Sequence, residues 1–389
     1  MKVVVYYPYA TGEKAFSGGV SKVAVSNIIA VHLNGDEPYL VLPNDNSGLI
    51  DYVKTNLPYC HVMPVDMLTV SLYTDVKNPF KRARLIVRNL YKFFTGKSKL
   101  RRVLKEIQPD VIHYHEIICY NLLNCYTNCR VVFHLHSFRF TSYGLIAGRF
   151  YKQINKYADV VLSPTLSIKK AVEDKLNNVC IVKTPYLELG SSGVDKQKQE
   201  LFEMVRKEGR IVFSFVGRIC AVKRIDHCLK ALAHLSEEER KKMKYMIIGG
   251  CNTTGDLDYK ASLELIIKEN SLEDCVEFVG YVNPVESVLP YIDYGVMLTE
   301  SEAMPMVGIE YLKYSIPTIG YDAPGINDYV IDRINGFVVR NGDVEHLSSV
   351  LKEVISQKNL PDFKQTIPDT YKGYSVEKFA EALQTVYKS

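Results

Sequence analysis

The residues with the clearest chemical potential are two glutamates eight positions apart, Glu302 and Glu310. Glu302 follows an apolar segment, Tyr294–Thr299, which predicts a strand, and Glu310 falls about one turn into the helix expected next. A carboxylate at each end of such a loop can accept hydrogen bonds from two hydroxyl-bearing parts of one ligand, a sugar ring and a ribose. Charge-assisted hydrogen bonds of this kind are short and strong. The alternative interpretation is a pair of solvated acids at a helix end.

Two cations follow the first strand expected in the second half of the chain. Arg218 comes directly after Phe215-Val-Gly217, and Lys223 follows five positions later, near the start of the next expected helix. Arginine supplies a planar fork of donors, lysine a point charge, and a helix start free N–H groups, a combination that suits a diphosphate. A basic surface cluster without a ligand is the alternative.

The first half offers a glycine pair, Gly18-Gly19, after its first expected strand and before a helix. Glycines at such a place allow the backbone to approach a phosphate or a sugar closely. A short turn without a ligand explains the same pattern.

Several groups could in principle bind a metal ion, and each has a simpler interpretation. Two His-x-His pairs end two expected strands, where alternation places each pair on one face. An Asp-x-Asp pair falls in an expected polar loop, and three cysteines do not have the spacing of a zinc finger. The groups are His113 with His115, His134 with His136, Asp256 with Asp258, and Cys119, Cys125 and Cys129. We therefore expect no metal site and no cofactor.

Length and composition describe a globular protein of more than one domain. The chain has 389 residues, of which 47% are hydrophobic and 24% charged, and a net charge of +4, too small to indicate nucleic acid as a partner. A single core rarely grows beyond ~250–300 residues. No apolar run approaches the ~18 residues of a membrane span, and the first residues do not resemble a signal peptide. Nine cysteines without a secretory segment predict a reduced, cytoplasmic protein.

One basic segment departs from this even balance of charge. Residues 77–105 contain 11 lysines or arginines and no acidic residue, with aromatic and aliphatic residues between them. A basic amphipathic surface of this kind can attach to the anionic inner face of a membrane or to a phosphorylated acceptor. A solvated helix face is the simpler alternative.

Strands and helices alternate twice along the chain, which predicts two doubly wound parallel sheets. We expect an N-terminal domain at residues 1–190, a C-terminal domain at 191–372 and a last helix at 373–389 that crosses back to the first domain. A linker is expected over Leu187–Glu200, and ligands are expected where strand ends meet a cleft between the domains. The predicted strands are Lys2–Tyr7, Pro38–Leu42, Asp110–His113, Arg130–His134 and Asp159–Leu162, then Arg210–Gly217, Lys244–Gly249, Val276–Gly280, Tyr294–Leu298 and Pro317–Gly320.

Taken together, these motifs resemble glycosyltransferase family 4, whose members are retaining enzymes with the GT-B fold of two Rossmann-like domains facing a central cleft. The similarity covers nearly the whole chain and is strongest from Phe215 to Val339. It is carried by Gly217-Arg218 with Lys223, Gly249-Gly250, Phe278-Val-Gly280-Tyr281-Val282, the Glu-x7-Glu run from Glu302 to Glu310, Asn335–Val339 and, in the first half, Gly18-Gly19, Pro109–His113 and Val131–His136.

The resemblance implies a role for each matched residue. Glu310 would bind the ribose and Glu302 the transferred hexose, while Arg218 and Lys223 would neutralise the leaving diphosphate without a metal. The remaining implied contacts are Tyr281 and Val282 with the base, Met306 and Val307 with sugar or phosphate through backbone N–H groups, Gly18 and Gly19 with the donor phosphates, and His136 with the sugar, which it would orient.

The resemblance thus implies a retaining hexosyltransferase that uses a nucleotide-diphosphate sugar, with UDP favoured over GDP. The acceptor would be a glycan or a lipid-linked saccharide in bacterial surface polysaccharide synthesis. Four residues depart from the family pattern: Arg224 stands where glycine is common, Ala303-Met304 where an aromatic is frequent, and Asp328 where a Glu is usual. The alternatives are a non-catalytic nucleotide-sugar-binding accessory subunit, an epimerase on the same fold, and a membrane-surface binding protein without chemistry.

Overall fold

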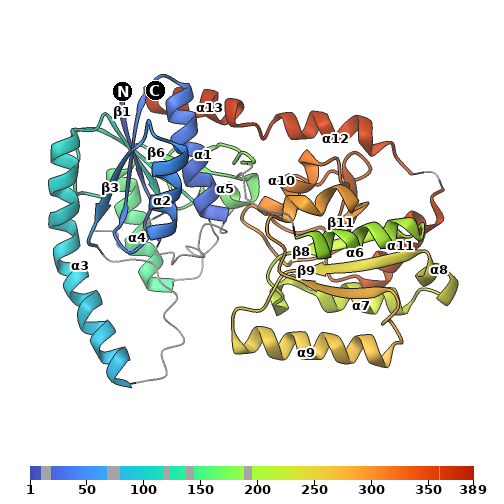
Figure 1. The fold of residues 1–389 in the computed structure, drawn as a ribbon. Helices are drawn as coiled ribbons and strands as arrows, with labels where there is room; N and C mark the ends of the chain where they lie inside the picture. Colours follow the sequence, from blue (N-terminus) through green and yellow to red (C-terminus); the bar gives the residue numbers. More distant parts are fainter. Residues whose placement is uncertain (10–18, 68–78, 117–122, 137–143, 188–194, 359) are drawn as a thin grey trace. The chain divides into compact units, whose positions relative to one another are not determined.

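The computed structural model describes residues 1–9, 19–67, 79–116, 123–136, 144–187, 195–358 and 360–389. It divides into two compact units, the first formed by Met1–Leu187 with Tyr374–Ser389 and the second by Glu188–Gly373. Each unit has one parallel sheet with helices packed on it (Figure 1). Gly18, Cys119 and the expected linker residues 188–194 lie outside the described residues.

The first unit contains a seven-stranded parallel sheet in the order β3-β2-β1-β4-β5-β6-β7. Its strands are β1 (Lys2–Tyr6), β2 (Glu37–Pro43), β3 (His61–Val65), β4 (Val111–His115), β5 (Arg130–His134), β6 (Val160–Ser163) and β7 (Val179–Ile181). Its helices are α1 (Gly19–Leu33), α2 (Ser47–Asn56), α3 (Pro79–Ile107), α4 (Gly144–Tyr157), α5 (Leu166–Val172) and α13 (Val376–Lys388). The strands β3 and β7 were not predicted; both are short, and most of their residues are not buried, so the apolar pattern is weak there.

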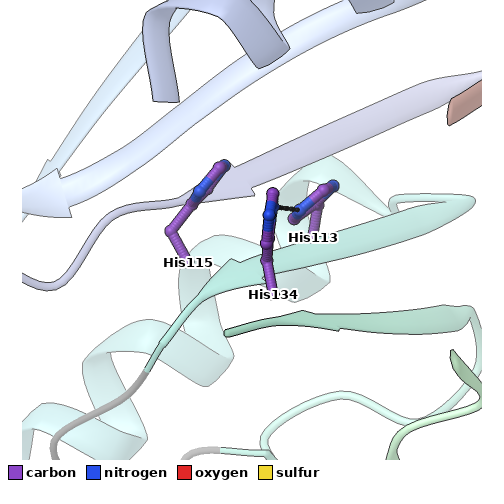
Figure 2. A group of neighbouring side chains, drawn as sticks. All are labelled: His113, His115 and His134. Atoms are coloured by element: carbon purple, nitrogen blue, oxygen red, sulfur yellow. Dashed lines mark hydrogen bonds between the residues drawn. The ribbon is translucent and has the colours of Figure 1, made fainter. Parts of the chain in front are cut away.

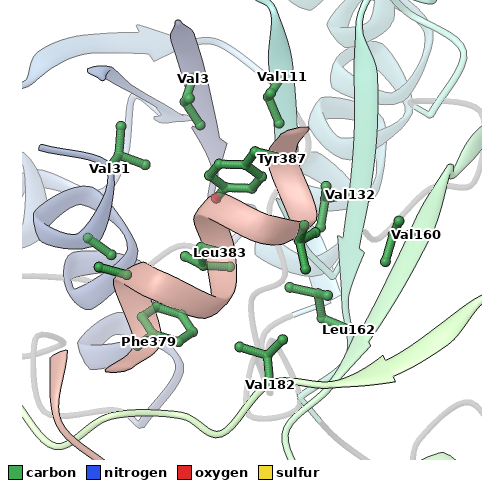
Figure 3. Close-up of a cluster of buried hydrophobic side chains, with 13 residues drawn as sticks. Val3, Val31, Val111, Val132, Val160, Leu162, Val182, Phe379, Leu383 and Tyr387 are labelled. Atoms are coloured by element: carbon green, nitrogen blue, oxygen red, sulfur yellow. The ribbon is translucent and has the colours of Figure 1, made fainter. Parts of the chain in front are cut away.

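The helix α13 is part of the core of the first unit. Phe379, Leu383 and Tyr387 project from one face of the helix onto valines of the central strands, including Val3 and Val132 (Figure 3). Residues four positions apart lie on one face of a helix, so these three side chains form a single apolar stripe. Ser375 begins the helix, because its side chain accepts a hydrogen bond from the backbone N–H of Lys378 (3.2 Å).

The second unit contains a six-stranded parallel sheet in the order β10-β9-β8-β11-β12-β13. Its strands are β8 (Ile211–Val216), β9 (Met243–Ile248), β10 (Val276–Gly280), β11 (Tyr294–Met297), β12 (Thr318–Tyr321) and β13 (Gly336–Val339). Its helices are α6 (Lys196–Lys207), α7 (Ile225–Ala233), α8 (Glu237–Lys241), α9 (Thr254–Glu269), α10 (Met306–Lys313), α11 (Val344–Ser356) and α12 (Phe363–Lys372), with 3-10 turns at η4 (Ala221–Lys223), η5 (Val285–Ser287) and η6 (Leu289–Tyr291). Figure 1 shows α7 and α9 on one side of this sheet and α10 on the other.

Two predictions about local structure were wrong. Part of the expected linker Leu187–Glu200 is helical, because α6 begins at Lys196 with Asp195 as its cap. The expected polar loop around Asp256 is helical, since α9 begins at Thr254. The side chain of Asp256 accepts hydrogen bonds from the backbone N–H groups of Asn252 (2.9 Å) and Thr253 (3.2 Å), so it caps the helix.

The basic segment forms most of α3, which has 29 residues, whereas the sequence indicated a helix only from Leu100. Not all of its basic side chains are available to a partner. Lys92 is buried, and its Nζ lies 3.4 Å from a carboxylate oxygen of Asp45 and of Asp66. Among the described residues, no helix combines the length and apolar character that a membrane crossing requires.

Candidate functional site

In the sheet of the second unit, the order of strands reverses between β8 and β11, which are neighbours. The loops that follow these two strands diverge at their carboxyl ends, the usual place for a ligand in an open parallel sheet. The loop after β8 carries Arg218 and Lys223, and the loop after β11 carries Glu302. Topology therefore brings the two strongest sequence motifs to one edge of one sheet.

Side chains join these two loops directly. Lys223 Nζ donates a hydrogen bond to the carboxylate of Glu302, and the guanidinium of Arg224 donates to the carboxylate of Glu300. The hydroxyl of Thr299 donates to the backbone carbonyl of Val222 at 3.1 Å. The ammonium of Lys223 and the carboxylate of Glu302 thus belong to one cluster, although 79 positions separate them.

Arg224 occupies a backbone conformation that explains why glycine is common at its position. Its φ angle is +49°, in the left-handed region, at the point where the 3-10 turn η4 gives way to α7. Glycine adopts this region without a steric penalty. Here an arginine takes it, and its guanidinium also donates to the side chain of Asn341 (2.9 Å).

Arg218 lies exposed at the same edge of the sheet, beside the beginning of α9. Burial raises the pKa of Asp256, but hydrogen bonds from the backbone of Asn252 and the positive charge of Arg218 outweigh this and lower it. Asp256 therefore serves as a helix cap within reach of the charge of Arg218. Metal binding would require the carboxylate to leave these hydrogen bonds.

Close backbone contacts hold this edge of the sheet together. A Cβ atom on Gly249 would lie 1.8 Å from the carbonyl oxygen of Gly217, and one on Gly325 would lie 1.6 Å from the carbonyl oxygen of Glu302. Glu302 also donates its backbone N–H to the carbonyl of Pro324 at 2.9 Å. No larger residue fits at either glycine, so both glycines fix the position of the loops that carry the charged residues.

Helix α10 places Glu310 and two backbone donors. Met306 and Val307 are its first two residues, and no side chain caps the helix among the described residues. The first N–H groups of a helix have no acceptor within the helix and carry partial positive charge. Glu310 lies one turn further along the helix, as predicted, and only 5% of its surface is exposed.

Two further predicted contacts follow β10. Tyr281 is exposed and Val282 is buried, in the segment after Gly280. The backbone carbonyl of Tyr281 already accepts a hydrogen bond from Lys198 Nζ. Lys198, on α6, therefore holds the part of this segment for which the family resemblance implies a contact with the base of the nucleotide.

In the first unit the order of strands reverses between β1 and β4. Gly19 is the first residue of α1, which follows β1. After β4, Glu116 has a left-handed backbone (φ +58°), and its carboxylate accepts hydrogen bonds from the hydroxyl of Tyr9 and from the backbone N–H of His136 (2.9 Å). Glu116 therefore holds the backbone of His136 in place.

His136 belongs to a cluster of four histidines at the carboxyl ends of β4 and β5. His113, His115 and His134 are fully buried, and Figure 2 shows their rings gathered beside the strands. Burial, reinforced by the neighbouring imidazoles, lowers the pKa of all four, that of His136 to about 3. The cluster is therefore neutral at physiological pH.

Nitrogens of His113, His115 and His134 lie within 4.8 Å of one another, which raises the question of a metal ion. The orientation of the rings is unfavourable for binding a metal ion. The rings of His113 and His115 are stacked at 4.6 Å and 11°, and those of His115 and His136 at 5.1 Å and 12°. Nitrogen lone pairs lie in the ring plane, so those of parallel rings cannot converge on one ion. Both nitrogens of His113 and of His115 also have hydrogen-bond partners.

A separate hollow of about 490 Å³ lies at the opposite edge of the second sheet, near the first residues of β8 and β9. Its cations have partners: Arg210 donates to the backbone carbonyls of Met243 (3.0 Å) and Asp274 (2.8 Å). It contains none of the predicted site residues.

The structure thus brings Lys223 into contact with Glu302, places Arg218, Met306, Val307 and Glu310 in the same unit, and places His136 and Gly19 in the first unit. The sequence reasoning missed Glu300, Thr299, Glu116, Asn27 and Tyr387. Glu300 and Thr299 could have been found from their nearness to Glu302. Asn27 and Tyr387 lie inside helices of ordinary pattern and gave no signal.

Two parallel-sheet units with functional groups at the carboxyl ends of their strands define the GT-B class of proteins. A family model described as "Glycosyl transferases group 1" matches residues 196–366, and one described as "Glycosyltransferase Family 4" matches residues 17–182. The chain therefore belongs to glycosyltransferase family 4 and is a glycosyltransferase with the GT-B fold.

Three similar proteins illustrate the relationship. An uncharacterized glycosyltransferase of Haemophilus influenzae is 23% identical over 305 residues, covering 74% of this chain and 79% of that protein. The UDP-Gal:alpha-D-GlcNAc-diphosphoundecaprenol alpha-1,3-galactosyltransferase of Escherichia coli is 21% identical over 318 residues, covering 77% and 80%. The crystal structure of HepE from Anabaena in complex with UDP aligns over 99% of both chains, with a TM-score of 0.75 and 15% identity.

Proposed function

We propose that this protein is a retaining, metal-independent hexosyltransferase that uses a UDP-sugar and acts on a lipid-linked or glycan acceptor. The observation that carries the proposal is the junction of the loops after β8 and β11. There Lys223 contacts Glu302, with Arg218 at the same edge of the sheet and the start of α10 four residues after Glu302. Cations, a carboxylate and free backbone N–H groups are the chemistry that a sugar diphosphate requires.

Each group has a separate task in this proposal. Arg218 and Lys223 stabilise the negative charge that develops on the leaving diphosphate, which is usually the largest catalytic contribution in group transfer. Their fixed charge takes the place of a metal ion. Glu310 accepts hydrogen bonds from the ribose hydroxyls, and Glu302, oriented by Lys223, accepts hydrogen bonds from the transferred sugar.

The remaining donor contacts come from the backbone and from the first unit. Tyr281 and Val282 contact the base, Met306 and Val307 donate N–H groups to the sugar or phosphate, and Gly18 and Gly19 approach the donor phosphates. His136 is neutral at physiological pH because burial lowers its pKa to about 3. It therefore orients the sugar, and the acceptor proton passes to the leaving diphosphate on the same face.

Known relatives support the choice of donor and acceptor. HepE of Anabaena has been solved with UDP and with UDP-glucose, and the Escherichia coli relative is named for a UDP-galactose donor and a diphosphoundecaprenol-linked acceptor. A lipid-linked acceptor in bacterial surface polysaccharide synthesis would place this protein at the inner face of the cytoplasmic membrane.

The surface of α3 supports peripheral attachment to such a membrane. Arg84, Val87, Arg88, Tyr91 and Phe94 are all exposed, and they recur at intervals of three and four residues along one face. Phe94 is 74% and Val87 67% exposed. Apolar side chains between arginines suit an anionic lipid surface.

Thermal unfolding of the purified protein with UDP-, GDP-, ADP- and CMP-sugars, in the presence of EDTA, tests the proposal. Ligand binding to the folded state raises the midpoint by mass action. We expect a rise with UDP-sugars that is lost in Lys223→Gln and retained in Lys230→Gln, a surface lysine on α7. No rise with any nucleotide sugar would favour a non-catalytic accessory subunit instead.

A further inference from the structure

Six side chains of the first unit form one continuous chain of hydrogen bonds. It runs from His136 to His115 (2.9 Å), from His115 to Asn27 (3.0 Å) and from Asn27 to Tyr387 (3.0 Å). It continues from Tyr387 to His113 (2.7 Å) and from His113 to His134 (3.1 Å). The chain therefore connects His136, at the end of β5, with α1 and with the C-terminal helix α13.

The amide of Asn27 fixes the direction of this chain. Its Nδ2 donates to Nε2 of His115, so that Nε2 carries a lone pair and no proton. A neutral imidazole has one proton, which must then sit on Nδ1 of His115. This N–H donates to Nε2 of His136, and the single proton of His136 is therefore on its Nδ1.

The other half of the chain follows the same logic. The hydroxyl of Tyr387 donates to Oδ1 of Asn27, so its oxygen is left to accept from Nδ1–H of His113. Nε2 of His113 then accepts from Nδ1–H of His134. The four histidines all carry their proton on Nδ1, and Nε2 of His134 is a buried lone pair without a partner among the described residues.

We propose that Asn27 and Tyr387 are positioning residues that set the tautomer of His136 through His115, so that His136 presents Nδ1–H as a hydrogen-bond donor to the transferred sugar. The role of that donor rests on the proposed function. The tautomer itself follows from the hydrogen bonds and can be measured separately. A positioning residue on α13 also gives the C-terminal helix a part in the chemistry, beyond its packing on the core.

Turning the amide of Asn27 around would reverse every proton in the chain. Nε2 of His134 would then be a buried N–H without an acceptor, where it is now a lone pair without a donor. Buried donors without partners are rarer in proteins than acceptors that lack one. Asn27 is also fully buried, so water cannot compensate for the reversal.

The direct test is a long-range ¹H–¹⁵N spectrum of the full chain labelled with ¹⁵N-histidine, assigned with single histidine variants. We expect His113, His115, His134 and His136 to show a protonated Nδ1 and an unprotonated Nε2. A protonated Nε2 on His136 in the wild-type spectrum would overturn the proposal, whether or not any variant folds.

Tyr387→Phe is the informative variant, and Tyr6→Phe is its matched control. Both tyrosines are buried in the first unit, but the hydroxyl of Tyr6 contacts Met67 Sδ at 3.7 Å and is not one of the six groups in the chain of hydrogen bonds. We expect Tyr387→Phe to mix or reverse the tautomer of His136 and to weaken UDP-sugar binding about fivefold, the value of one hydrogen bond. Binding of UDP alone should not change. An unchanged His136 tautomer in Tyr387→Phe would contradict the proposal.

Two further outcomes distinguish this proposal from a metal site and from the proposed function. If zinc alone binds in equal molar amount and removes the Nδ1–H signals, the cluster is a metal site and the proposal fails. If the four tautomers are as expected but no nucleotide sugar binds, the hydrogen-bond chain is confirmed and the proposed function is the part that fails.

Discussion

The two units carry different kinds of side chains at the carboxyl ends of their central strands. In the second unit, the loops after β8 and β11 bring together side chains of opposite charge at partly exposed positions, with Lys223 on Glu302 and Arg224 on Glu300. In the first unit, the histidines towards the carboxyl ends of β4 and β5 are neutral imidazoles, most of them fully buried and joined by hydrogen bonds. Both edges stand at the same topological position of a parallel sheet.

This difference indicates a division of labour. Fixed charges that keep contact with water can bind and stabilise a dianion. A buried neutral network can only direct hydrogen bonds, but it does so with little freedom. The second unit should therefore determine the binding of the diphosphate, and the first unit the orientation of the sugar.

The largest expected effect is a loss of stability in mild acid. The four histidines of the cluster have lowered pKa values in the folded state, so below pH 6.5 the unfolded chain binds protons that the folded chain does not. Stability is complete above pH 6.5 and falls as the pH drops towards the folded pKa of each group, about 3 for His136. The loss is about 1.4 kcal/mol per pH unit for each histidine.

Thermal unfolding between pH 7 and pH 4.5 measures this loss. Most carboxyl groups titrate near or below the acid end of this window, so the loss above about pH 5.5 comes mainly from histidines. A matched pair sharpens the test: His234 is exposed on the second unit, and His234→Gln should leave the pH dependence unchanged. A midpoint that stays constant across the window would mean that the histidine cluster is charged or open to water.

The next effect concerns Lys223. Replacing it with glutamine should slow sugar transfer by about 10²–10³-fold, because one charge that stabilises the leaving diphosphate is lost. The rate of UDP release from a UDP-sugar in the presence of acceptor measures this. Lys230→Gln, on the surface of α7, is the control. Turnover at the wild-type rate in Lys223→Gln would remove the charged edge of the second sheet from the mechanism.

Glu310→Gln should have a smaller effect, confined to donor binding. The substitution keeps the shape of the buried side chain but exchanges a charged acceptor for a neutral one, which costs about 1.5–3 kcal/mol, or roughly 10–100-fold in affinity. Titration calorimetry with UDP measures the change, and Glu269→Gln, an exposed glutamate at the end of α9, serves as the control. Equal affinity of wild type and Glu310→Gln would rule out the ribose contact.

The smallest expected effect is on membrane attachment. Exchanging Arg84 and Arg88 for glutamine should weaken binding to vesicles containing anionic lipid by about fivefold for each charge. Flotation at low salt measures this, and Lys372→Gln, an exposed lysine of the second unit, is the control. If the wild type does not float with anionic vesicles, α3 does not bind membrane.

The parts of the fold that the sequence predicted are those with strong apolar patterns. Strands such as β1 and β8 are buried along nearly their whole length and appear as continuous apolar runs. Strands such as β3 and β7, most of whose residues are not buried, lack that pattern. Helix α6 was not predicted because most of its residues are polar and a segment of linker-like composition precedes it.

The candidate site was predictable to the extent that its residues are close in sequence to a strand end. Arg218, Lys223 and Glu302 lie in the loops that follow two neighbouring strands, so their position at one sheet edge follows from topology. The network around His136 was not predictable, because it depends on Asn27 and Tyr387, which are 360 positions apart and meet only when α1 packs on α13. The left-handed backbone of Arg224 was likewise hidden, since the residue there is not glycine.

The division of labour is tested most directly by calorimetric titration of UDP into wild type, Lys223→Gln and His136→Ala, with sugar transfer measured on the same samples. We predict that Lys223→Gln loses both UDP affinity and transfer, whereas His136→Ala keeps the UDP affinity of wild type and loses transfer. UDP affinity that falls in His136→Ala and is unchanged in Lys223→Gln would contradict the account.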